Sequence, residues 1–387
     1  MLDTQRQPLI DRLVDDAIAS FDIPEHIYER AAARYTAAAE WLKRRWDARG
    51  IGGAIYPQGS FRLGTVVRPI HADGEYDMDL VCERDLRKES VSQAALKGEV
   101  GLDLRSYVAS GPEGDPTLDE GKRCWTLDYP REPFHMDFLP AIPNPDAAPD
   151  GILITDREVR LWQWSNPVRF SQWFYATMAR ELQEARIVLA EQKQVDVEDV
   201  QEWRVRTTLQ RAVQALKRHR DLYFADRDFA PASIIITTLA GRAYRGGGDL
   251  YDVLVTVSRD MPDYVELRDG VLWVENPVEE KENFADRWRS EPQRADAFFE
   301  WIAAAHRDFV SFGADSGVDR TLDRIAKSFG GDARTAAGAG LGNQIRTTRD
   351  AGALTVTPTG GLAAAASGIT VPRHTFHGDP PAPSSRP

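Results

Sequence analysis

Apolar residues recur at helical spacing in several long segments of the chain. Residues 25–48 form an alanine-rich run with periodic large apolar side chains that stops at Gly50, and this pattern predicts a helix. Residues 204–224 place apolar side chains three and four positions apart, which predicts a second helix. We expect two further helices over residues 231–244 and 283–309.

Short runs rich in β-branched and aromatic residues lie between these helical patterns. Three of them, residues 54–56, 78–82 and 134–139, predict strands in the first part of the chain. Two more, residues 264–267 and 271–274, flank an Arg-Asp-Gly turn and predict a hairpin. The order of these patterns indicates an α+β fold, with a strand-containing first lobe and a mainly helical second lobe.

The composition changes sharply near residue 330. The segment 330–387 holds five arginines, three aspartates and one phenylalanine among many Gly, Ala, Thr, Ser and Pro residues. Such a segment buries too little apolar surface to offset its chain entropy, so we predict a flexible, disordered tail. Its residues 371–379 have the composition of a short docking motif, with a solvated tail of no role as the alternative. We therefore divide the chain into a first lobe over 1–165, a second lobe over 166–329 and this tail.

Overall composition narrows the classes of function. Of the 387 residues, 42% are hydrophobic, which suffices for a core, and no run of 18 apolar residues predicts a transmembrane helix. The charged N-terminus is unlike a signal peptide, and two cysteines suit a reducing cytosol, so we expect a cytoplasmic protein. The formal net charge of −12 argues against a grip on long nucleic acid, which usually requires a basic surface.

Asp77 and Asp79 form an Asp-x-Asp pair inside a predicted strand. Side chains two positions apart on a strand point to the same face, so both carboxylates can converge on one cation. Oxygen ligands of this kind suit Mg²⁺. Acidic pairs at this spacing are also common on solvated surfaces, so the pair alone does not establish a metal site.

Two further features accompany this pair. Gly59-Ser60 follows a predicted strand, and such a turn lets backbone N–H groups and a hydroxyl approach phosphate oxygens closely. An ordinary turn is the alternative for this dipeptide. Asp137 stands alone in the apolar strand 134–139, where a carboxylate needs a partner such as a metal ion or a salt bridge.

Together, the Gly-Ser turn, the Asp-x-Asp pair and the third acid resemble the DNA polymerase β-like nucleotidyltransferase superfamily. The wider pattern resembles a narrower group, the bacterial CD-NTases. These are relatives of cyclic GMP-AMP synthase that make cyclic oligonucleotide signals in CBASS anti-phage defence. The segments that carry this resemblance are 58–69, 75–81, 216–221, 231–239, 274–277 and 282–284.

The resemblance implies a specific fold and metal site. The fold would be a polymerase β-like core, a mixed sheet with flanking helices, which faces a helical lobe across a central cleft. Asp77, Asp79 and Asp137 would hold two Mg²⁺ ions, with Mn²⁺ as an alternative, and Asp137 would lie close to the acceptor hydroxyl.

The same resemblance implies a binding site for the donor triphosphate. Gln58, Gly59 and Ser60 would contact the phosphates from one side, and Lys217 and Ser233 from the other. An ammonium suits phosphate as a point charge, and the start of a helix offers free N–H groups. The alternative for Lys217 is an exposed lysine within a basic surface run.

The function that the resemblance implies is enzymatic. ATP or another NTP would be consumed, pyrophosphate would leave, and the product would be a cyclic di- or oligonucleotide. An effector protein would respond to this product, and a ubiquitin-conjugation-like partner would act on the tail. The histidines show no spacing typical of a zinc site, so the zinc insertion with which animal relatives grip DNA has no counterpart, and we expect no dependence on duplex DNA.

Two alternatives stay open from the sequence. The first is a nucleotidyltransferase of the same fold that modifies tRNA or protein. The second is a nucleotide-binding sensor without turnover.

Overall fold

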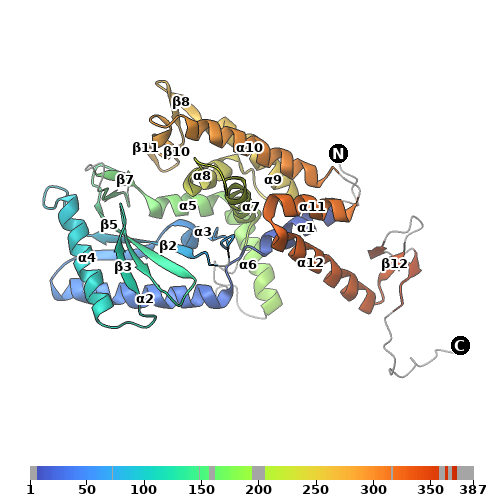
Figure 1. Ribbon diagram of the computed structural model, residues 1–387, viewed down its shortest axis with the longest axis horizontal. Coiled ribbons are helices and arrows are strands. Elements are labelled where there is room, and N and C mark those ends of the chain that lie inside the picture. Colours follow the sequence, from blue (N-terminus) through green and yellow to red (C-terminus); the bar gives the residue numbers. More distant parts are fainter. Residues whose placement is uncertain are drawn as a thin grey trace.

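The computed structural model describes residues 7–71, 73–147, 149–156, 162–193, 205–314, 317–356, 362–364 and 368–372. Two lobes lie side by side in it (Figure 1). The first lobe is built on a mixed sheet, and the second is mainly helical. This arrangement confirms the α+β, bilobal fold expected from the sequence.

The sheet of the first lobe has the strand order β1-β2-β5-β4-β3, and β6 and β7 extend it from β5. The central pair β2 and β5 is parallel, whereas the other pairs are antiparallel. The predicted strands 54–56, 78–82 and 134–139 lie within β1, β2 and β5. The strand bounds are β1 Gly53–Pro57, β2 Tyr76–Arg84, β3 Thr117–Glu120, β4 Trp125–Asp128, β5 Phe134–Pro143, β6 Ile152–Ile154 and β7 Gln163–Ser165.

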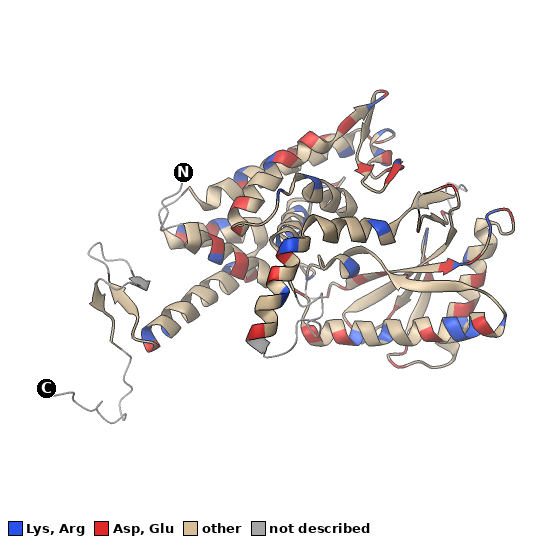
Figure 2. Cartoon of the chain, turned by 180° about the vertical axis from the view of Figure 1, so that it is seen from behind, with Lys and Arg blue, Asp and Glu red and all other residues tan. Residues whose placement is uncertain are grey.

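Two long helices cover this sheet. Helix α2 (Glu25–Ala48) has the predicted bounds and runs beneath the sheet in Figure 1, while α4 (Gln93–Ala109) packs beside it. Their buried side chains, including Trp46 and Leu104, share one apolar core with the inner face of the sheet. On its outer side, α2 carries acidic and basic residues in alternation (Figure 2).

The second lobe encloses a separate core made from helices far apart in the sequence. The predicted helices 204–224 and 231–244 correspond to α7 and α8, and the predicted hairpin is formed by β8 and β9. The elements of this lobe are α5 Pro167–Thr177, α6 Ala179–Lys193, α7 Thr208–Tyr223, α8 Ser233–Ala243, α9 Leu250–Asp260, β8 Glu266–Arg268, β9 Val271–Trp273, β10 Glu275–Asn276, β11 Glu279–Asn283, α10 Gln293–Phe312 and α11 Val318–Phe329.

This lobe differs from the sequence prediction in one helix bound and in one additional helix. The helix expected over 283–309 begins ten residues later, at Gln293, because Asn283 ends strand β11 and its side chain accepts from the Val274 backbone N–H. Helix α1 (Gln7–Ala19) was not anticipated, and its apolar face lies in the core of the second lobe. By packing, residues 7–19 therefore associate with the helical lobe, although they precede the first lobe in the sequence.

The disordered tail expected from residue 330 onwards is wrong for its first part. Gly331–Asp350 forms helix α12, which packs against α1 and α11 and buries Ala333 and Ala337. Small side chains allow this close packing, because a Cβ at Gly340 would collide with the carboxylate of Asp16. Strands β12 Leu354–Val356, β13 Leu362–Ala364 and β14 Ile369–Thr370 follow, whereas most of the expected docking motif, from residue 373 onwards, lies outside the described residues.

The described helices include none with both the length and the apolar character that a membrane span requires.

Candidate active site

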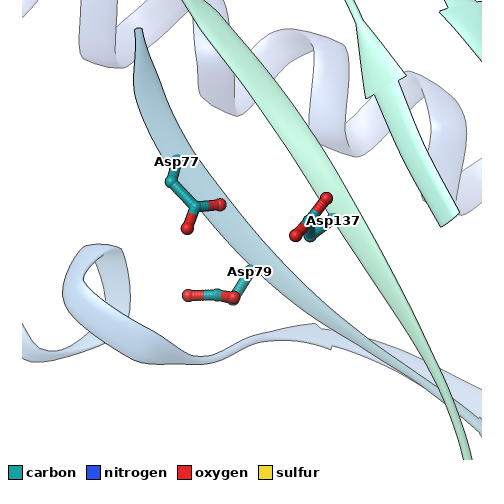
Figure 3. A group of neighbouring side chains, drawn as sticks. All are labelled: Asp77, Asp79 and Asp137. Atoms are coloured by element: carbon teal, nitrogen blue, oxygen red, sulfur yellow. The ribbon is translucent and has the colours of Figure 1, made fainter. Parts of the chain in front are cut away.

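The three predicted acids converge on one face of the central strand pair. Parallel β2 and β5 align Asp79 with Asp137, and Asp77 lies two residues before Asp79 on the same face. Each carboxylate offers an oxygen within 4.8 Å of the others. Figure 3 shows Asp77 and Asp79 on one strand and Asp137 on its neighbour, with the carboxylates directed into a common space.

Burial makes this cluster electrostatically costly. Desolvation, followed by the charges of Asp77 and Asp137, raises the pKa of Asp79 to about 7. A divalent cation between the carboxylates would offset this repulsion. The donor set consists of carboxylate oxygens, which are the ligands that Mg²⁺ and Mn²⁺ prefer, so these residues fit the metal site that the sequence predicted.

A tight turn after β1 brings the Gly-Ser pair against the acids. The backbone N–H of Gln58 donates to the carbonyl oxygen of Asp79 at 2.9 Å, which ties the turn to β2. Gly59 has a φ of +63°, and a Cβ there would collide with the carboxylate of Asp79, so the position requires glycine. Ser60 follows in the short helix α3 (Gly59–Leu63).

The second lobe contributes Lys217 from α7 and Ser233 from the first turn of α8. Lys217 is buried, and its Nζ donates to the carbonyl oxygen of Thr65 at 3.1 Å and to the Thr65 hydroxyl at 3.3 Å. Burial, followed by the nearby Arg220 guanidinium, lowers the pKa of Lys217 to about 7. Arg220 also donates to Ser233 Oγ at 2.8 Å. The alternative for Lys217, an exposed surface lysine, is therefore wrong.

These residues surround a cavity of about 390 Å³ between the lobes. The two carboxylates on β2 lie on one side of it, and the α7 and α8 residues lie on the other. Gln58 and Asp137 are not part of its lining. Gln58 contacts the site through its backbone N–H, which bonds to Asp79, and Asp137 lies beside the two acids that line the cavity. The predicted residues that line the cavity are Gly59, Ser60, Asp77, Asp79, Lys217 and Ser233.

Three polar residues of the site were not identified from the sequence. His135 lies two positions before Asp137, so the same period-two rule that joined Asp77 and Asp79 places it on the acids' face. Thr126 donates its hydroxyl to Asp137 from the adjacent strand β4, and only the strand pairing shows this contact. Arg220 lines the cavity one helical turn after Lys217, a spacing that could have indicated it.

His135 has carboxylates on both sides. Its hydrogen bond to Asp77, and then that to Glu75, raises the pKa of His135 to about 9 against the opposing effect of burial.

A larger cavity of about 860 Å³ adjoins the first through Ile234, which lines both. Its wall combines tryptophans with basic side chains from both lobes. These include Trp162, Trp164, Trp273, Arg123, Lys281 and Arg287.

Residues 54–140, which contain the Gly-Ser turn and the three acids, match the family described as cyclic GMP-AMP synthase DncV-like, nucleotidyltransferase domain. A c-di-GMP synthase of Roseivirga ehrenbergii is 27% identical over 361 residues, which cover 91% of this chain and 93% of the relative. The cyclic dinucleotide synthase CdnG of Bradyrhizobium diazoefficiens is 26% identical over 303 residues, covering 72% of this chain and 70% of the relative.

Solved structures agree on the fold. The CD-NTase CdnG of Bradyrhizobium diazoefficiens in complex with GTP superimposes with a TM-score of 0.68 at 24% identity, over 87% of this chain and 99% of that one. The GTP-bound form of Vibrio cholerae DncV gives 0.54 at 16% identity, over 85% and 88% of the two chains. The bilobal fold, the acid cluster and the similarity along the chain agree, and together they support a bacterial CD-NTase.

Proposed function

We propose that the protein is a Mg²⁺-dependent nucleotidyltransferase that condenses NTPs into a cyclic dinucleotide. The observation that carries this proposal is the convergence of three carboxylates on one sheet face beside the Gly-Ser turn. The relatives named above as cyclic dinucleotide synthases support the product class. Both solved relatives named above hold GTP, so GTP stands beside ATP as a candidate substrate.

The chemistry requires a nucleotide hydroxyl to attack the α-phosphorus of an NTP. A bond forms between this 3′- or 2′-oxygen and phosphorus, the bond to the β-phosphate oxygen breaks, and pyrophosphate leaves. Metal ions held by Asp77, Asp79 and Asp137 would neutralise the charge that develops on the phosphate oxygens. Asp137 orients the hydroxyl and accepts its proton, because its carboxylate lies beside Asp79 and is itself held by Thr126.

The donor triphosphate is assigned to the 390 Å³ cavity. Ser60 offers its hydroxyl and backbone N–H next to the acids, and Ser233 offers the first turn of α8 from the facing wall. Lys217 supplies positive charge from within that wall. The adjoining 860 Å³ cavity, with its tryptophans and basic side chains, suits a second nucleotide through stacking and charge. Ring closure then requires the linear intermediate to turn round and react again in the same site.

The biological setting of the proposal follows from the family. We propose a cytoplasmic enzyme of CBASS anti-phage defence, whose product acts on an effector protein and whose activity does not depend on duplex DNA. A ubiquitin-conjugation-like partner at the C-terminal end remains part of this proposal, as does the functional division into 1–165, 166–329 and 330–387.

One incubation separates this function from its competitors. The protein is mixed with four labelled NTPs and Mg²⁺, and the products are treated with phosphatase. A phosphatase-resistant product is expected and indicates a cyclic nucleotide. Product that appears only with added tRNA or protein would replace the proposal with a modifying nucleotidyltransferase. No product under any of these conditions would indicate a nucleotide-binding sensor.

A further inference from the structure

His135 shares the sheet face of the three acids. In the parallel pairing of β2 and β5 it is the partner of Asp77, just as Asp137 is the partner of Asp79. The four side chains therefore form a two-by-two group on adjacent strands, in which three members are carboxylates and the fourth is an imidazole.

Both ring nitrogens of His135 face carboxylates. Nδ1 lies 2.9 Å from Glu75 Oε2, and Nε2 lies 3.4 Å from Asp77 Oδ1. The His135 side chain is 27% exposed, whereas that of Asp77 is 55% exposed. The more enclosed imidazole thus stands against the more exposed carboxylate and limits the directions in which that carboxylate can turn.

A metal-binding carboxylate needs this kind of restraint. Side chains that hydrogen-bond to ligands fix their orientation, and removal of such a partner typically lowers metal affinity about 10- to 100-fold. Asp77 has this requirement because its half-exposed side chain would otherwise sample several rotamers.

We propose that His135 is a positioning residue that holds the Asp77 carboxylate in its metal-binding orientation. Through Glu75, it also ties the segment that precedes β2 to β5. The inference rests on the proposed function, since it assumes that Asp77 and Asp79 bind the cation. It assigns His135 an action through Asp77, without direct ligation of the metal.

The test measures Mn²⁺ binding to the full chain without nucleotide, from the electron paramagnetic resonance signal of free Mn²⁺. His135→Ala should weaken the affinity about 10-fold or more. His135→Gln keeps an N–H donor but is a poor replacement for an imidazole ligand, so it should stay within about threefold of the wild type. His306→Ala removes a histidine of the second lobe that contacts Ser258, and it should leave the affinity unchanged.

Three outcomes would overturn the inference. The first is wild-type Mn²⁺ affinity in His135→Ala, and the second is a loss in His135→Gln as large as in His135→Ala. The third is a kcat of His135→Ala that does not rise toward the wild-type value at high Mg²⁺, since a misdirected ligand weakens metal binding and excess metal compensates for it. Melting temperature and far-ultraviolet circular dichroism identify a variant that fails to fold. If His135→Ala does not fold, a loss of Mn²⁺ affinity of about 10-fold or more in a folded His135→Gln variant would overturn the inference.

The same titration separates this inference from the proposed function. If the double variant Asp77→Asn, Asp79→Asn binds Mn²⁺ as the wild type does, the metal assignment itself is wrong. If that variant loses the metal while His135→Ala keeps it, only the positioning role of His135 is wrong.

Discussion

The two walls of the 390 Å³ cavity are built in opposite ways. The strand wall brings like charges together, with Asp77 and Asp79 on β2 and Asp137 beside them on β5. The helix wall presents Lys217, whose charge is buried and already engaged with Thr65. Both walls carry a group whose charged form is disfavoured, because burial raises the pKa of Asp79 and lowers that of Lys217, each to about 7.

This contrast indicates which part of the substrate each wall serves. On the strand wall three carboxylates stand against one imidazole, that of His135, so a cation is the natural complement to the excess negative charge. The helix wall presents Lys217 and Arg220, with Asp221 beside them, so a phosphate is the natural complement to its basic side chains. The metal-bound triphosphate of the proposed function would carry both complements.

Substitution of the acids on the strand wall should cause the largest loss of activity. Asp77→Asn with Asp79→Asn should lower nucleotide transfer to less than about a hundredth of the wild-type rate, because amides cannot replace anionic metal ligands. Pyrophosphate release measures the rate. A matched control is Asp226→Asn with Asp228→Asn, an exposed pair at the same spacing in the loop after α7, which should keep full activity. Retained activity in the first variant would refute the metal site.

Substitutions at Lys217 on the helix wall and at Ser60 beside the acids should change KM for the NTP, and by less than the loss of rate expected for the acids. Lys217→Ala should raise KM for the NTP about 10-fold or more, and Ser60→Ala about fivefold, as expected for a charged and a neutral hydrogen bond to phosphate. In both variants kcat should change less than KM, since these groups bind the donor before the reaction. Steady-state kinetics with a varied NTP concentration decides this. Unchanged KM in both variants would place the triphosphate elsewhere.

The Gly59 turn beside the strand wall predicts a loss of stability on substitution. Gly59→Ala should lower the free energy of unfolding by about 1–2 kcal/mol, because alanine is strained at this positive φ. The collision with the Asp79 carboxylate should add to this loss. The matched control is Gly98→Ala inside helix α4, where a Cβ meets no other atom within 4 Å and helix propensity favours alanine. Urea unfolding of the two variants compares them directly, and equal stabilities would contradict the proposed strain.

The burial of Lys217 predicts a pH dependence of stability. Burial lowers the pKa of Lys217 from 10.5 to about 7 in the folded chain. Between these values the unfolded chain binds more protons at this residue, so its contribution to stability rises with pH and is lost as the pH falls toward 7.

Lys217→Met removes this titration. The free energy of unfolding of the wild type, relative to Lys217→Met, should therefore increase from pH 7 to about pH 9.5. Unfolding in urea at the two pH values measures the difference between the proteins. Parallel behaviour of both proteins across this range would show that Lys217 stays charged in the folded state.

The sequence by itself determined the parts of this protein that depend on local periodicity. The spacing of Asp77 and Asp79 implied a shared face because alternate side chains of any strand do so. Helices α2, α7 and α8 were predicted correctly from their apolar residues. In α2 the buried residues repeat along one face, whereas α7 and α8 are buried on most sides. The same period-two rule would have identified His135 beside Asp137.

Only the tertiary structure decided the features that depend on what packs against each segment. Helix α12 forms from small residues because α1 and α11 supply the apolar surface that its own sequence lacks. Thr126 reaches Asp137 through a strand pairing that no local pattern reports. Lys217 stands in a run of basic residues typical of a surface, yet it is buried, and Thr65 of the other lobe accepts hydrogen bonds from its ammonium group. Burial depends on residues distant in the sequence, and burial changes the charge of a side chain, so this part of the site's electrostatics could not be predicted from the chain alone.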